Sequence, residues 1–107
     1  MNHEEFARAS HKSGSNCSQS VFSSFVRELC LSTQEAMSIA PRPRSEGGQC
    51  GAYLAGLAVL NELKPEVASA FTEKFLAENG STECKVLRGR CNDMVGCAAR
   101  LVEELMG

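Results

Sequence analysis

The sequence predicts an all-α fold, a single small domain in which a bundle of five or six helices surrounds a central helix that follows Cys50. Three observations predict this class. Two stretches carry a capping residue followed three residues later by Gln or Glu, which is a signature of helix starts. Apolar residues recur with the 3.6-residue period of helices that bury one face. Pro65 and Gly80 stand where a further helix would start and stop.

The N-terminal part is predicted to form two helices. Residues 3–12 carry apolar side chains on one side and charged ones elsewhere, which favours a short amphipathic helix. The next helix starts at Asn16, with Gln19 completing a capping box, and runs to about Leu29. We interpret the two histidines of the first helix as surface residues rather than ligands: His3 and His11.

A second capping box, Ser32 with Glu35, predicts a short helix through about Ile39. Residues 41–48 are rich in proline and glycine and are expected to form a loop with solvated arginines. The helix after Cys50 is predicted to be central, because small residues would let other helices approach it closely on several sides. Those small residues are Ala52, Ala55 and Gly56.

The C-terminal part is predicted to hold a helix, a single turn and a long last helix. The first of these opens with Pro65, buries Phe71 and Phe75, and stops at Gly80. Residues 81–83 cap a short turn that contains Cys84 and ends at Gly89. Cys91 begins the last helix, in which apolar residues recur at helical spacing, so we expect Cys91 on the buried seam.

Composition narrows the possible functions. The 107 residues are enough for one domain, 1–107, with its own core, so six cysteines are not needed as staples. A net charge of −2 gives no basic surface for nucleic acid. No signal peptide is evident and no stretch reaches the roughly 20 apolar residues of a membrane span, so we expect a cytoplasmic protein. In a reducing cytoplasm, several cysteines indicate metal or redox chemistry rather than a framework of structural disulfides.

Cys50 is the first candidate for this chemistry. It follows Gly47 and Gly48 and precedes Gly51, a glycine density typical of backbone that approaches a bound group, although a tight turn without a ligand would use the same glycines. The unpaired N–H groups of a helix start also stabilise a thiolate. We therefore expect Cys50 to be a reactive sulfur or a metal ligand, with these three glycines beside the bound group.

Four cysteines share this placement at or just before a predicted helix start, and we predict that their sulfurs converge in one pocket. They are Cys17, Cys50, Cys84 and Cys91. The other two, Cys30 at a helix end and Cys97 in mid-helix, are interpreted as apolar packing residues that the site does not need. The absence of a Cys-x-x-Cys pair argues against the usual zinc-finger and thioredoxin signatures.

Over about residues 16–105 the chain resembles the C_GCAxxG_C_C family of small bacterial redox-active proteins. The matching segments are Asn16-Cys17-Ser18-Gln19, Gly47-Gly48-Gln49-Cys50-Gly51-Ala52, Cys84 with Leu87, and Cys91 with Val95 and Ala98-Ala99. The position that closes the family motif with glycine holds Ala55, and Gly56 follows one residue later. The resemblance implies an all-helical redox-active protein, with an iron–sulfur cluster as one form of its chemistry, and it supplies no substrate.

Three functions are compatible with these residues. The leading hypothesis is redox chemistry at the four cysteines, as iron–sulfur ligands for electron transfer or as a dithiol/disulfide pair. A structural zinc held by the same four thiolates, in an interaction module, is the second. A metal-free helical binding domain is the third. We expect a redox partner protein and no nucleic acid. The sequence leaves open whether the protein is an enzyme and whether it forms a homodimer.

Overall fold

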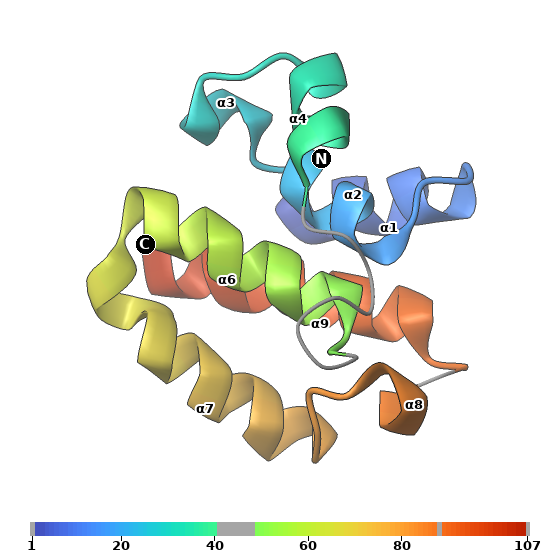
Figure 1. Ribbon diagram of the computed structural model, residues 1–107, viewed down its shortest axis with the longest axis vertical. Helices are drawn as coiled ribbons and strands as arrows, with labels where there is room; N and C mark the ends of the chain where they lie inside the picture. Colours follow the sequence, from blue (N-terminus) through green and yellow to red (C-terminus); the bar gives the residue numbers. More distant parts are fainter. Residues whose placement is uncertain (1, 41–48, 88, 107) are drawn as a thin grey trace.

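The computed structural model describes residues 2–40, 49–87 and 89–106, with the backbone alone at 84 and 85. These residues confirm the all-α class (Figure 1). The helices are α1 (His3–Lys12), α2 (Cys17–Ser23), α3 (Val26–Leu29), α4 (Thr33–Ile39), α6 (Gly51–Leu63), the 3-10 helix η1 (Pro65–Val67), α7 (Ala68–Asn79), α8 (Cys84–Leu87) and α9 (Cys91–Met106). In place of a sheet, the described ranges contain one isolated antiparallel bridge, between Gln49 and Glu83.

The predicted helix boundaries that depend on local capping are confirmed. Both capping boxes form, because the Asn16 and Ser32 side chains accept from the backbone N–H groups of Gln19 and Glu35, whose side chains bond back to the capping backbone. Gly80 ends α7 in the left-handed conformation, with φ of 79°. Each of these signals lies within a few residues of the boundary that it sets.

The single helix predicted over residues 16–29 is wrong, because the chain breaks between α2 and α3. The backbone N–H of Ser24 donates to the Val21 carbonyl at 3.1 Å, and the Ser24 hydroxyl donates to the same oxygen at 2.7 Å. In a continuing helix that carbonyl would accept from Phe25, whose N–H instead bonds Phe22, 3.2 Å away. A serine hydroxyl that competes for backbone groups in this way commonly ends a helix.

The helix after Cys50 is central, as predicted. Helix α6 packs against α2, α3, η1, α7 and α9, and Figure 1 shows it running through the middle of the molecule with α7 below it and α9 behind. Ala52 and Ala55 are fully buried. A side-chain carbon added at Gly56 would lie 2.6 Å from Cζ of Phe71, so the glycine permits the close contact with α7.

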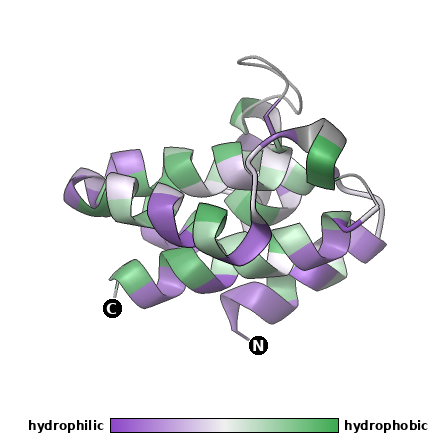
Figure 2. Ribbon diagram, turned by 90° about the horizontal axis from the view of Figure 1, so that it is seen from below, coloured by the Kyte–Doolittle hydropathy of each residue, from purple (hydrophilic) through white to green (hydrophobic). Residues whose placement is uncertain are grey.

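An aromatic cluster forms the core between α6 and α7. The ring centroid of Tyr53 lies 5.8 Å from that of Phe71 and 5.3 Å from that of Phe75, distances typical of favourable aromatic pairs. The Tyr53 hydroxyl, which would otherwise be left without a partner, lies 2.9 Å from the Thr72 hydroxyl. Figure 2 shows hydrophobic and hydrophilic residues alternating along the helices, as expected where each helix buries one face.

The N-terminal helix α1 lies along the C-terminal helix α9 and runs in the opposite direction. His3, at the start of α1, contacts Glu103 near the end of α9, while Arg8 contacts Asn92 and Asp93 at its start. A side-chain carbon at Gly96 would lie 2.3 Å from Arg8 Nε, so the arginine packs directly on the α9 backbone. Within the described ranges, no helix has the length and apolar character needed to span a membrane.

Candidate functional site

Cys50 lies at the junction of two segments that are distant in sequence. It is the N-cap residue of α6 and is buried, with 5% of its surface exposed. Its backbone N–H donates to the Thr82 carbonyl at 2.6 Å, next to the antiparallel bridge between Gln49 and Glu83. The bridged residues are those directly before Cys50 and Cys84, so the start of α6 is held against the start of α8.

Cys17 is the first residue of α2 and is half-buried beside α1. Its Sγ lies 3.7 Å from Nε2 of His11, within reach of a hydrogen bond to sulfur. The interpretation of His11 as a surface residue is therefore wrong, because this half-buried ring lies against a candidate redox sulfur. Sequence spacing gave no signal for this contact, which depends on the turn between α1 and α2.

Cys91 is the first residue of α9 and is half-buried. The next residue, Asn92, lies with Nδ2 3.3 Å from Nδ1 of His11. One imidazole thus connects the start of α9, which carries Cys91, with the sulfur of Cys17 on α2.

The cysteines of the four helix starts are therefore held in two neighbourhoods. A backbone bridge joins the segments of Cys50 and Cys84, and His11 joins those of Cys17 and Cys91. Convergence of all four sulfurs stays a prediction. Of the three candidate glycines, Gly51 is the buried first residue of α6, whereas Gly47 and Gly48 lie outside the described residues.

The four-cysteine ligand set stays a prediction, because the side chain of Cys84 lies outside the described atoms. Among the described His, Cys, Asp and Glu side chains, no group of three or more is placed to hold a metal ion. The side chains of Cys17, Cys50 and Cys91, which are described, therefore do not form a metal site by themselves.

A buried polar group next to Cys17 has no hydrogen-bond partner within residues 2–40, 49–87 and 89–106. The hydroxyl of Ser18 is fully buried and has no partner among the described residues. Leaving such a group unsatisfied costs about 1–3 kcal/mol. The start of α2 is therefore a place where the hydrogen bonding of the described structure is incomplete.

The two remaining cysteines differ from each other. Cys30 is exposed and adopts a left-handed conformation, with φ of 59°, where α3 ends, so its interpretation as a buried packing residue is wrong. Cys97 is buried, as predicted, among Glu78, Asn79 and Arg100. Burial raises the pKa of the Cys97 thiol, because the thiolate loses its hydration there.

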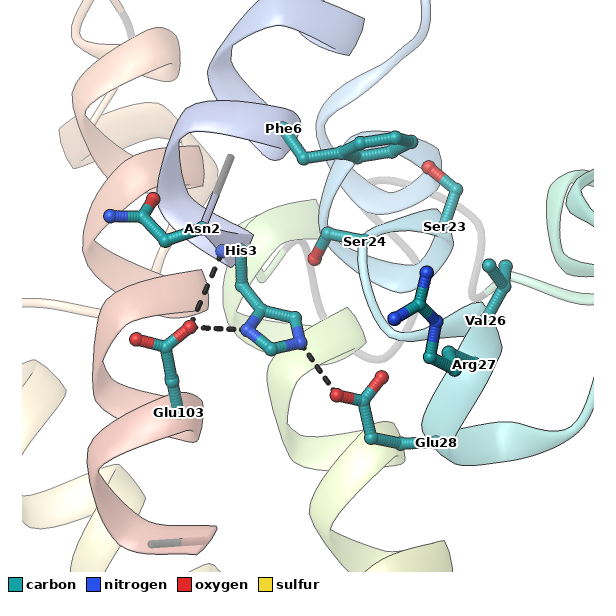
Figure 3. A pocket seen from close by; sticks show the side chains of 9 residues that line it. All are labelled: Asn2, His3, Phe6, Ser23, Ser24, Val26, Arg27, Glu28 and Glu103. Carbon is teal, nitrogen blue, oxygen red and sulfur yellow. Dashed lines mark hydrogen bonds and ion pairs between the residues drawn. The ribbon is translucent and has the colours of Figure 1, made fainter.

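A pocket of about 300 Å³ lies where α1, α3 and α9 meet (Figure 3). The His3 ring stacks on Phe25, with centroids 4.2 Å apart. Its Nε2 lies 2.7 Å from Glu28, and its Nδ1 contacts Glu103. The hydrogen bond from His3 holds the pKa of the Glu103 carboxyl below its usual value. No sequence pattern marks this cluster, because its members come from three separate helices.

Comparison with known proteins gives one match. Residues 15–105 match the model of the family described as "Putative redox-active protein (C_GCAxxG_C_C)". No curated protein and no solved structure shows significant similarity to the chain. The match covers most of the chain, including all four candidate cysteines, and leaves α1 outside it.

Proposed function

We propose that this chain, which belongs to the C_GCAxxG_C_C family of redox-active proteins, carries out thiol–disulfide exchange with Cys50 and Cys84 as its redox couple. One observation carries the choice of this pair. The antiparallel bridge between Gln49 and Glu83 holds the backbone of the two cysteines together across a long stretch of sequence. Residues placed diagonally across such a bridge have Cα atoms about 7–8 Å apart.

This spacing lies just beyond the reach of a relaxed disulfide. Disulfides span Cα separations of up to about 7 Å, so the bond would need a small backbone shift at the α8 side. A disulfide formed with such a shift is easier to reduce than a relaxed one. In the reaction, two thiols and a partner disulfide become one protein disulfide and two partner thiols. The proposal thus includes a partner that carries a disulfide, and a cytoplasmic location in which cellular reductants return the couple to thiols.

Oxidation in a graded glutathione redox buffer tests the proposal. We expect the protein to lose two thiols, and peptide mapping to find the peptides of Cys50 and Cys84 linked. Cys50→Ser and Cys84→Ser should each abolish the link. Cys30→Ser, which removes an exposed cysteine in the left-handed turn after α3, is the matched control and should retain it. Oxidised protein without this link would overturn the assignment of the couple.

Two metal-based alternatives share the same cysteines. Four thiolates are the ligand set of an iron–sulfur cluster and of a structural zinc, and Cys17, Cys50, Cys84 and Cys91 would hold either one. Anaerobic purification followed by visible absorption and metal analysis separates the readings. Brown protein that contains iron and sulfide would overturn thiol exchange in favour of electron transfer through an iron–sulfur cluster. Stoichiometric zinc would favour the structural-zinc interaction module. Colourless, metal-free protein supports thiol exchange.

A further inference from the structure

His11 lies between a candidate redox sulfur and an amide that is held in place from the other side. Its Nε2 lies 3.7 Å from Cys17 Sγ, and its Nδ1 lies 3.3 Å from Asn92 Nδ2. The three residues come from α1, α2 and α9. His11 can donate a hydrogen bond to Cys17 only if Nε2 carries the ring hydrogen. The orientation of the Asn92 amide decides which ring nitrogen carries it.

Arg8 fixes the orientation of the Asn92 side chain. Arg8 Nη1 can act only as a hydrogen-bond donor, and it donates to Asn92 Oδ1 at 3.0 Å. Asn92 Nδ2 donates to the Arg8 carbonyl, which can only accept, at 3.3 Å. In a reversed amide, Nδ2 would face the Arg8 guanidinium, which is also a donor, and Oδ1 would face the Arg8 carbonyl, which is also an acceptor. The NH2 group of Asn92 therefore faces the imidazole.

Arg8 is itself held firmly. Its Nη1 also donates to the Asn92 backbone carbonyl at 3.2 Å and to Asp93 Oδ1 at 3.3 Å, and its Nε donates to Glu4 at 3.2 Å. The guanidinium lies against the backbone at Gly96, where a side chain would displace it. Arg8, Asp93 and Glu4 are the charged groups in this network, in which one guanidinium pairs with two carboxylates.

We propose that Asn92 selects the His11 tautomer with hydrogen on Nε2, and that this N–H donates to Cys17, making His11 the positioning residue of the Cys17 thiolate. Because Nδ1 must accept from Asn92, the neutral ring has its hydrogen on the nitrogen that faces sulfur. Protonation of Nδ1 would set two donors against each other. His11 consequently acts as a hydrogen-bond donor to the thiolate and not as the base that removes the thiol proton.

This role deepens the proposed exchange and rests on it for its biological meaning. Cys17 loses its proton to water, and the thiolate attacks one sulfur of the partner disulfide. A bond forms between Cys17 and that sulfur, the partner's S–S bond breaks, and the departing thiolate takes a proton from water. The Cys50 thiolate then attacks Cys17 Sγ and releases the second partner thiol. Cys84 in turn attacks Cys50 Sγ, which returns Cys17 as a thiol and leaves the disulfide between Cys50 and Cys84. Because α1 lies outside the family match, this chain supplies His11 from a segment that the family model does not cover.

The test is the rate at which iodoacetamide alkylates Cys17 across pH, resolved by peptide mass spectrometry in the reduced full-length protein. Loss of one hydrogen bond to a charged group should slow Cys17 in His11→Ala by about tenfold near neutral pH and move the midpoint of its pH profile upward. His11→Gln, whose amide can still donate, should recover part of the rate. Lys12→Ala, an exposed neighbour, should match the unmutated protein, and Cys30 serves as the internal reference in every variant.

Asn92→Asp gives a second signature. A carboxylate facing Nδ1 favours a hydrogen there, so the pH profile of Cys17 should change shape rather than only shift. Unchanged Cys17 kinetics in both His11→Ala and Asn92→Asp would overturn the proposal. If either variant fails to fold, the 15N NMR chemical shifts of His11 in the unmutated protein test the proposed tautomer. A hydrogen on Nδ1 of the neutral ring would contradict the proposal. Alkylation does not require Cys50 and Cys84 to form a disulfide, so failure of the exchange reaction is detected separately.

Discussion

A cysteine in this fold takes its chemistry from the groups around it. Cys17 lies beside His11, Cys50 is buried at a helix start, and Cys97 is surrounded by Glu78, Asn79 and Arg100. Cys30, by contrast, is open to solvent. A thiolate is the reactive form of cysteine, so both hydration and nearby hydrogen-bond donors decide which sulfur reacts.

Cys30 and Cys97 should differ strongly in their reaction with iodoacetamide. Burial raises the pKa of Cys97, which lowers its thiolate fraction at a given pH, and 8% exposure also limits access of the reagent. At pH 8 we expect Cys30 to react faster by on the order of tenfold or more. Quantitative mass spectrometry of the two peptides measures this ratio. Equal rates in the folded protein, or a faster Cys97, would contradict the burial argument, and denatured protein should show the two alike.

The sequence places each cysteine along its helix but not its neighbours in space. Capping boxes and glycine stops lie within a few residues of the boundaries they set, so the helix-start positions of Cys17, Cys50, Cys84 and Cys91 were predictable. The contact between His11 and Cys17 depends on a turn and on Asn92 from a distant helix. No periodicity encodes such a contact.

At the scale of helices, local patterns predict which residues face inward but underestimate how much of a helix is buried. The apolar seam predicted for α9 is buried at Met94, Ala98 and Leu101 and half-buried at its two ends, Cys91 and Leu105. Val95 and Val102 beside it are buried as well. Helix α9 packs against α1, α2, α6 and α7, so its buried surface extends well beyond one stripe. The break after Ser23 was missed because the sequence pattern does not show that the Ser24 hydroxyl bonds the Val21 carbonyl of its own helix.

Gly56→Ala should destabilise the contact between α6 and α7. The added carbon would lie 2.6 Å from Phe71 Cζ, and the ring is confined by Tyr53 and Phe75. Overpacking of this kind costs about 1–3 kcal/mol, against a gain of about 1 kcal/mol for alanine over glycine in a helix. We expect a net loss of about 1 kcal/mol in the free energy of unfolding, measured in urea.

A double-mutant cycle separates the steric clash from other effects of Gly56→Ala. Phe71→Leu removes the ring atoms that the new carbon meets, so the alanine should cost less in that background than in the unmutated protein. An identical loss in both backgrounds would show that Phe71 is not the obstacle.

For the whole molecule, the sequence predicts the class and the central helix, whereas the partners of the terminal helices emerge only in three dimensions. Helix α1 lies along α9, tied near one end through His3 and near the other through Arg8 (Figure 1). Hydrophobic patterning shows that α1 has an apolar face without showing which helix it covers. The pairing matters for the site, because it places His11 beside Asn92.

The tie between His3 and Glu103 should make the docking of α1 on α9 sensitive to acid. The His3 hydrogen bond holds the pKa of Glu103 below its usual value, so the folded protein favours the ionised carboxylate. Such a group adds stability above its unfolded-state pKa, about 4.3 for glutamate, and the contribution is lost as pH falls through the folded-state value. Because the Glu103 side chain is 45% exposed, we expect a contribution of no more than about 1 kcal/mol.

Glu103→Gln should therefore be less stable than the unmutated protein at pH 7. The difference should shrink as pH falls below about 4.3 and through the lowered pKa of Glu103 in the folded protein. Thermal or urea unfolding across this pH range measures the difference. Glu104→Gln is the matched control, because it removes the same charge from the same helix but its partner, Arg100, also lies on α9. A difference that does not shrink on acidification, or an equal loss in Glu104→Gln at pH 7, would show that the contact with His3 does not hold α1 against α9.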